Sequence, residues 1–127
     1  MIQLERLEVS GSPSELGRGQ GEALRERIRV FVEMRFEAMD GYFPQRGYRT
    51  GDHREKVLAV GAKAKVLFEA WDPDGHAEQV GIAEGAGIDP LRLYTACNMT
   101  DFRDAVLLAA PEGPRLKKLV DEGCSSV

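Results

Sequence analysis

The residues with the clearest capacity for chemistry are Gly123 and Cys124, which lie within the stretch Asp-Glu-Gly-Cys-Ser-Ser-Val at residues 121–127. A cysteine thiol can attack the carbonyl group of the peptide bond that precedes it. Glycine leaves that carbonyl sterically open and lets the backbone adopt the strained geometry that an acyl shift needs. Hydrolysis of the resulting thioester would free Cys124 as a new N-terminus.

A freed Cys124 would carry both a base and a nucleophile. Its α-amino group has a reference pKa of about 7.7 to 8.0 and its thiol one of about 8.5, so the two can exchange protons near neutral pH. No histidine is then required. The alternative is that Cys124 is an ordinary residue of a frayed chain end, and the dipeptide alone favours that alternative.

A second group of polar residues follows a short helical pattern: Asn98, Asp101, Arg103 and Asp104. They fit helix capping and solvated charge, and they fit a place near an active site equally well. The two histidines, His53 and His76, and the other cysteine, Cys97, carry no mechanism of their own. For the histidines we expect surface or capping roles, and for Cys97 a small buried position in the core.

Three glycines at alternate positions, Gly17, Gly19 and Gly21, superficially suggest a phosphate-binding turn. Their spacing is not that of the dinucleotide fingerprint, and a capping signal upstream places them inside a helix rather than before one. Glycine costs about 1 kcal/mol in a helix interior, so a compensating contact is expected. The better prediction is that Gly17 and Gly21, four residues apart on one face, pack closely against a neighbouring element.

Composition narrows the classes of function. The 127 residues are 43% hydrophobic and 30% charged, which is typical of one soluble domain. The net charge is −4 and no basic block is present, so nucleic acid is not an expected partner. No apolar signal core or spanning segment occurs, which predicts a cytoplasmic protein that needs no membrane. With two cysteines and two histidines, neither a metal site nor another cofactor is expected.

The elements that must position these residues are mostly helical. Near alternation predicts a strand over residues 2–10, and Ser12, Pro13 and Glu15 then form the start of a helix that should run from residue 13 to residue 39. A loop is expected over 42–51, a second helix up to residue 71, a third from Pro73, and a fourth from Pro90. The apolar run 105–110 could be a helix end or a strand.

Two apolar stripes should face the core. The first helix carries Leu16, Ala23, Leu24, Ile28, Phe31, Val32, Met34 and Met39, and the second carries Val57, Val60, Ala64, Leu67, Phe68 and Trp71.

The whole chain resembles the propeptide or α-chain region of the isopenicillin-N acyltransferase family. The resemblance rests on the order and spacing of five stretches after the strand. These are Gly-Ser-Pro-Ser-Glu-Leu-Gly-x3-Gly at 11–21, Trp-Asp-Pro at 71–73, Gly-Ile-Ala-Glu-Gly-Ala-Gly at 81–87, Asn-Met-Thr-Asp-Phe at 98–102 and Asp-Glu-Gly-Cys-Ser-Ser at 121–126. The family belongs to the N-terminal nucleophile (Ntn) hydrolases, which are made as inactive precursors that cleave themselves at a Gly-Cys bond.

The resemblance implies an α+β fold class: a mostly helical α-chain with one N-terminal strand, part of a four-layer αββα fold that a β-chain from the same precursor completes. Residues 1–123 would form the α-chain, and residues 124–127 the first residues of the β-chain. Gly123 and Cys124 would flank the cleaved bond, with Cys124 as the nucleophile of the mature enzyme. Its expected neighbours are Asn98, Asp101, Phe102, Arg103 and Ser125.

The activity implied is that of an amide hydrolase or acyltransferase, inactive as this fragment alone. Its substrate would be a small-molecule amide or acyl compound, with acyl-CoA or an amine acceptor among the candidates. A different class of function stays open, in which the chain is a non-catalytic helical module that binds a partner protein through its apolar faces.

Overall fold

The computed structural model describes residues 6–110, and within this range it contains six helices and no strand. The helices are α1 (Pro13–Ala23), α2 (Arg25–Gln45), α3 (His53–Trp71), α4 (Pro73–Ala86), α5 (Pro90–Cys97) and α6 (Met99–Ala109).

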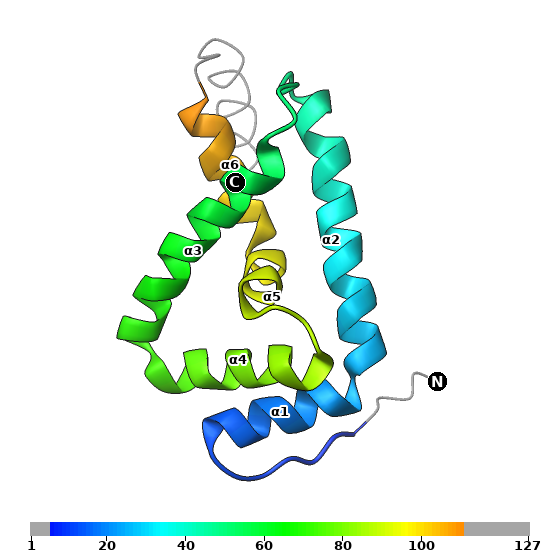
Figure 1. The fold of residues 1–127 in the computed structure, drawn as a ribbon, viewed down its shortest axis with the longest axis vertical. Helices are drawn as coiled ribbons and strands as arrows, with labels where there is room; N and C mark the ends of the chain where they lie inside the picture. Colours follow the sequence, from blue (N-terminus) through cyan, green and yellow to red (C-terminus); the bar gives the residue numbers. More distant parts are fainter. Residues whose placement is uncertain (1–5, 111–127) are drawn as a thin grey trace.

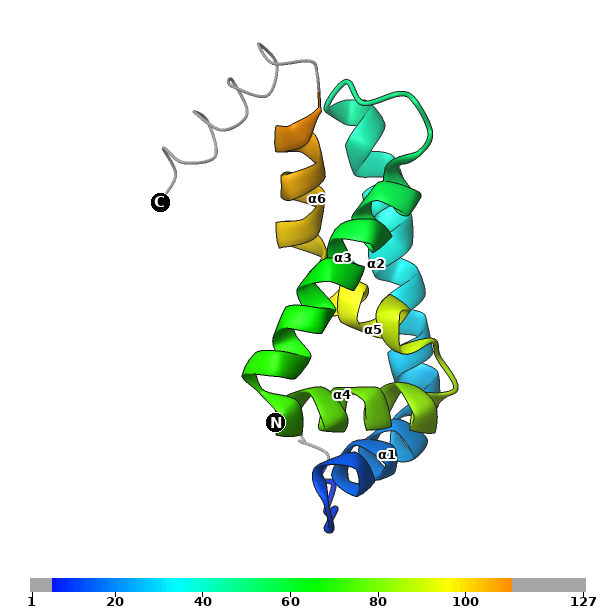
Figure 2. The ribbon, with the colours of Figure 1, turned by 60° about the vertical axis from the view of Figure 1, so that its left-hand side comes forward.

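Helices α2, α3 and α4 form three sides of a triangle around α5, and α1 lies along the outer side of α4 (Figure 1). Helix α6 continues from α5 and packs against α3, as the turned view in Figure 2 also shows. The core lies where α2, α3, α5 and α6 meet. Its largest fully buried side chains are Phe36, Phe43, Met39, Val32, Val57 and Thr95.

The expected α+β class is wrong for the described residues, because they form an all-α structure. The predicted strand covered residues 2–10, of which residues 6–10 are described; they have no regular secondary structure and are all exposed. Leu7 and Val9, which would have faced a core, are 42% and 36% exposed. A strand needs a neighbouring strand for its backbone hydrogen bonds, and residues 6–110 provide none.

Three of the helices, α1, α4 and α5, begin at capping signals in the sequence, whereas the Asp52 side chain before α3 makes no capping hydrogen bond. The Ser12 hydroxyl accepts a hydrogen bond from the Glu15 amide at 3.2 Å, and α1 begins at Pro13 as predicted. Asp72 accepts from the Gly75 amide at 3.0 Å and Asp89 from the Arg92 amide at 3.2 Å, which caps α4 and α5. The apolar run 105–110 is resolved in favour of a helix, since α6 extends to Ala109.

The first long helix is interrupted at a position that no glycine or proline marks in the sequence. Leu24, with φ −111° and ψ 20°, separates α1 from α2, so the predicted helix over residues 13–39 is two helices. The second of them continues past the expected stop near Gly41 and includes Pro44 in its last turn. The bend at Leu24 allows α1 to lie along α4 instead of extending the line of α2 (Figure 1).

Helices α1 and α4 meet at backbone contact through two pairs of glycines. Gly17 lies against Gly81, and Gly21 lies against Gly85. The two glycines of α1 are four residues apart, and so are the two glycines of α4. A Cβ atom on any of the four would collide with backbone atoms of the opposite helix. Because residue numbers rise in the same direction along both helices, the two run parallel. The predicted close packing of Gly17 and Gly21 is confirmed, and it explains why glycine is present despite its cost in a helix.

Candidate functional site

The two residues proposed to react, Gly123 and Cys124, and their neighbour Ser125 lie outside the described residues. What the structure describes is the group expected around them: Asn98, Asp101, Phe102 and Arg103. Asn98 forms the junction between α5 and α6, and its Nδ2 donates a hydrogen bond to the Tyr94 carbonyl oxygen at 2.9 Å. Asp101 lies in the first turn of α6 and is exposed.

The other two expected neighbours, Phe102 and Arg103, each pack against a tyrosine ring. Phe102 is 8% exposed, and its ring lies 5.7 Å from that of Tyr94. The Arg103 guanidinium lies 3.7 Å from the centre of the Tyr42 ring, and its Nε donates to Asp104 at 3.3 Å. Successive residues of a helix point about 100° apart, so Asp101 faces solvent while Phe102 faces the core. These four side chains do not converge on one point.

A polar cluster that the sequence did not reveal joins α2 to the start of α3. Asp40 accepts two hydrogen bonds from Arg54, at 3.0 and 2.7 Å, and its Oδ1 lies 2.7 Å from His53 Nε2. The hydrogen bond from Arg54 is the main reason that the pKa of Asp40 is lowered; desolvation opposes it and His53 reinforces it. The His53 ring also stacks on Phe43, with their centres 5.1 Å apart. No short sequence motif contains this cluster, because Asp40 precedes His53 by 13 residues.

The neighbouring carboxylate, Asp52, organises the connection between the same helices. It accepts hydrogen bonds from the hydroxyls of Tyr48 and Thr50, both at 2.6 Å, and Lys56 lies 3.3 Å away. The Thr50 hydroxyl is the largest cause of the lowered pKa of Asp52, followed by that of Tyr48. Neither carboxylate is paired with a cysteine or serine nucleophile in the described part of the chain. We therefore interpret both clusters as structural interactions that hold the end of α2 to the start of α3.

The Asp40 cluster predicts a pH dependence of stability. Because the folded-state pKa is lowered, ionised Asp40 stabilises the fold at pH values above its unfolded pKa of about 3.9, and this contribution is lost as pH falls through the folded-state pKa. The Asp40 side chain is 40% exposed, so Asp40→Asn should cost only about 1 kcal/mol at pH 7.

Urea denaturation at pH 7 and at pH 3 measures this difference, which should shrink at the lower pH. Asp101→Asn is the matched control, since Asp101 is exposed and has no ion pair among residues 6–110. An Asp40→Asn variant whose loss of stability stayed the same at both pH values would contradict the assignment.

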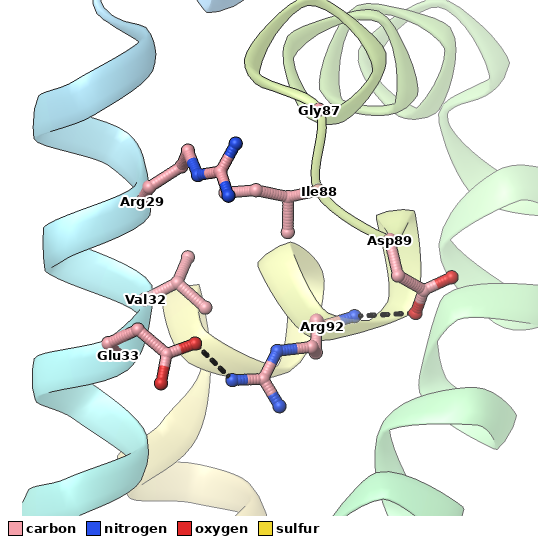
Figure 3. Close-up of a pocket in the computed structure, with 7 residues that line it drawn as sticks. All are labelled: Arg29, Val32, Glu33, Gly87, Ile88, Asp89 and Arg92. Carbon is pink, nitrogen blue, oxygen red and sulfur yellow. Dashed lines mark hydrogen bonds and ion pairs between the residues drawn. The ribbon is translucent and has the colours of Figure 1, made fainter.

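A hollow of about 410 Å³ opens between α2 and the connection from α4 to α5 (Figure 3). Arg29, Val32 and Glu33 line it from α2, Gly87, Ile88 and Asp89 from the connection, and Arg92 from α5. The Arg92 guanidinium donates to Glu33 at 2.6 Å and lies 4.4 Å from the centre of the Phe36 ring. Gly87 has φ 70° and ends α4 in the left-handed conformation. This hollow was not predictable from the sequence, because only the fold brings its lining residues together.

No protein-family profile, no curated protein and no solved structure matches this chain.

Two further expectations can be compared with the structure. Cys97 is exposed, so the prediction of a buried core cysteine is wrong. His53 and His76 have side chains that are only 15% and 13% exposed, because each packs against an aromatic ring. Within residues 6–110, no three metal-ligating side chains gather, and no helix is long and apolar enough to cross a membrane.

Proposed function

We propose that this chain is the helical α-segment of a self-processing Ntn-type cysteine amidohydrolase or acyltransferase, with cleavage between Gly123 and Cys124. The observation that carries the proposal is the Gly-Cys bond in its sequence context, Asp-Glu-Gly-Cys-Ser-Ser, downstream of four further stretches in the order of the isopenicillin-N acyltransferase family. A β-chain from the same precursor would complete the enzyme.

The proposed processing proceeds in two steps. The Cys124 sulfur attacks the Gly123 carbonyl carbon, the peptide C–N bond breaks, and the released amine takes the thiol proton. Water then hydrolyses the thioester, which leaves a carboxylate on Gly123 and restores the thiol. In turnover, the same thiol attacks an amide substrate, the amine product leaves with a proton, and water or an amine acceptor resolves the acyl-thioester.

The described residues indicate what the upstream stretches contribute. Gly17 and Gly81 belong to two of these stretches, and both are used in the contact between α1 and α4. Asp72, from a third, caps α4. These residues specify a helical scaffold rather than reacting groups, which fits a mechanism in which Cys124 itself supplies the nucleophile and, once freed, the base.

The direct test is intact mass measurement and N-terminal sequencing of the protein expressed with its natural continuation after Val127. The proposal expects two polypeptides, one ending at Gly123 and the other beginning at Cys124. A single uncleaved polypeptide that nevertheless hydrolyses amides, or a cut at another bond, would contradict it.

A second candidate, a non-catalytic module that binds a protein, is favoured by one specific observation. Val66, Leu67 and Trp71 near the end of α3 are 67%, 71% and 84% exposed, although Leu67 and Trp71 were expected to face the core. Leu67 and Trp71 are four residues apart and share one helix face. Large exposed apolar side chains on one face are typical of surfaces that another protein covers.

The orientation of this face predicts how α3 responds to substitution. Leu67→Ser and Trp71→Ser should each change the free energy of unfolding of the 127-residue chain by less than about 0.5 kcal/mol, because neither side chain is buried. Phe68→Ser is the matched control: its ring stacks on Tyr94 at 5.6 Å, so the loss should be at least about 1 kcal/mol. Urea denaturation checks all three, and a loss for Trp71→Ser equal to that for Phe68→Ser would refute the orientation.

A further inference from the structure

We infer that the hollow between α2 and the α4–α5 connection binds a small organic carboxylate with a compact apolar body. The ligand would place its carboxylate against Arg25 and Arg29 of α2 and its apolar part against Val32 and Ile88. This site involves no reaction at Cys124, so a protein that bound no carboxylate here would leave the proposed self-processing unaffected.

Two arginines at the mouth of the hollow have no anionic partner among residues 6–110. Arg29 extends from α2 toward Ile88, as Figure 3 shows. Arg25 lies one turn earlier on the same helix, and a Cβ atom added to Gly87 would be 2.7 Å from its Nη2 atom. Like charges four residues apart on a helix repel each other. A carboxylate between them would relieve that repulsion and accept charge-assisted hydrogen bonds from both.

The remaining charged groups of the hollow are Glu33, Arg92 and Asp89. Arg92 is paired with Glu33 at 2.6 Å and packs over Phe36. Asp89 accepts from the Arg92 amide at 3.2 Å and keeps its negative charge, but it lies on the other side of the hollow from Arg29 (Figure 3). Within residues 6–110, the unpaired positive charge of the hollow is therefore at Arg25 and Arg29, on the side of α2. That distribution favours an anion over a cation.

The apolar surface and the size of the hollow restrict the rest of the ligand. Val32 and Ile88 both belong to the hydrophobic core, so the floor of the hollow is apolar. Val32 is only 1% exposed, so Ile88 offers a ligand most of this apolar surface. A side chain at Gly87 would have to adopt φ 70° and would displace the Arg25 guanidinium group from its place beside the hollow. A volume of about 410 Å³ suits a small molecule rather than a chain of residues.

A competing explanation is that the arginines only offset the partial negative charge at the C-terminal end of α4, whose last turn has no basic residue. In that case Arg29 would stabilise the fold but would bind nothing. The experiment separates the two by measuring ligand binding and thermal stability on the same variants.

The test is a titration of the ¹⁵N-labelled 127-residue chain with benzoate, followed through the amide signals of Gly87 and Ile88. We expect a saturable shift with benzoate, none with its neutral analogue benzamide, and weaker binding of inorganic phosphate. Arg29→Gln should weaken benzoate binding about tenfold or more while leaving the melting temperature without ligand unchanged. Arg49→Gln, an exposed arginine in the α2–α3 connection, is the matched control and should bind benzoate like the wild type.

Three outcomes would overturn the inference. Benzamide could shift the same signals as strongly as benzoate, which would mean that the charge is not recognised. Phosphate could bind as tightly as benzoate, which would mean that the site takes any anion. Arg29→Gln could lower the melting temperature without weakening benzoate binding, which would assign Arg29 to the end of α4 alone.

Discussion

Gly17→Ala should destabilise the chain by about 1 to 2 kcal/mol, a large effect for so small a change. The added Cβ atom would collide with the Glu78 carbonyl group, which belongs to the backbone of α4 and cannot rotate away. Overpacking of an interior typically costs about 1 to 3 kcal/mol, and a contact between two backbones leaves no flexible side chain to absorb it. The gain in helix propensity, about 1 kcal/mol, opposes this cost only in part.

Gly41→Ala provides a matched control for this prediction. Gly41 is also in a helix, α2, but a Cβ atom there would meet nothing within 4 Å. The same substitution should therefore stabilise the chain by about 0.5 to 1 kcal/mol through helix propensity. Urea denaturation of both variants measures the contrast, and a Gly17→Ala variant as stable as Gly41→Ala would disprove the close contact between α1 and α4.

Cys124→Ala should abolish cleavage between Gly123 and Cys124 in the precursor. Alanine has no nucleophile, so the acyl shift cannot begin and one intact polypeptide should accumulate. Cys124→Ser should cleave more slowly than the wild type, because a hydroxyl is a weaker nucleophile than a thiolate near neutral pH. Electrophoresis and intact mass measurement over time distinguish the three proteins.

The second cysteine supplies the control for this experiment. Cys97 is exposed at the end of α5, so Cys97→Ala should leave the fold and the cleavage unchanged. If the precursor with Cys124→Ala were cut at the same bond and at the same rate as the wild type, the bond would be broken by another protease and the proposed function would fail.

The positions at which helices begin could be predicted from the sequence because they depend on neighbouring residues. Ser12, Asp72 and Asp89 each precede a proline, and each caps a helix through its own side chain. The close packing of Gly17 was predictable for a related reason, since glycine inside a helix needs a compensating contact. The partner helix α4 was not predictable, because it lies about sixty residues further along the chain.

The faces of the helices were harder to predict, because apolar periodicity does not say which part of a stripe will find a partner. Phe31 and Met34 on α2 were expected to face the core, but they are 39% and 58% exposed. Leu67 and Trp71 near the end of α3 were also expected there, and they too are exposed. The alternation over residues 2–10 indicated a strand, yet residues 6–10 have no partner strand. For the candidate site, the residues near Asn98 were placed by resemblance, and the helical period of α6 separates Asp101 from Phe102.

The glycine contact between α1 and α4 also fixes the register of the two helices. With Gly17 opposite Gly81 and Gly21 opposite Gly85, both glycine pairs meet at once. Sliding one helix by a single four-residue step would leave only one glycine opposite another and would bring the remaining glycines against side chains or past the end of the helix. The equal spacing of the glycines in the two helices therefore allows only one register, in which α1 is held at a single position along α4.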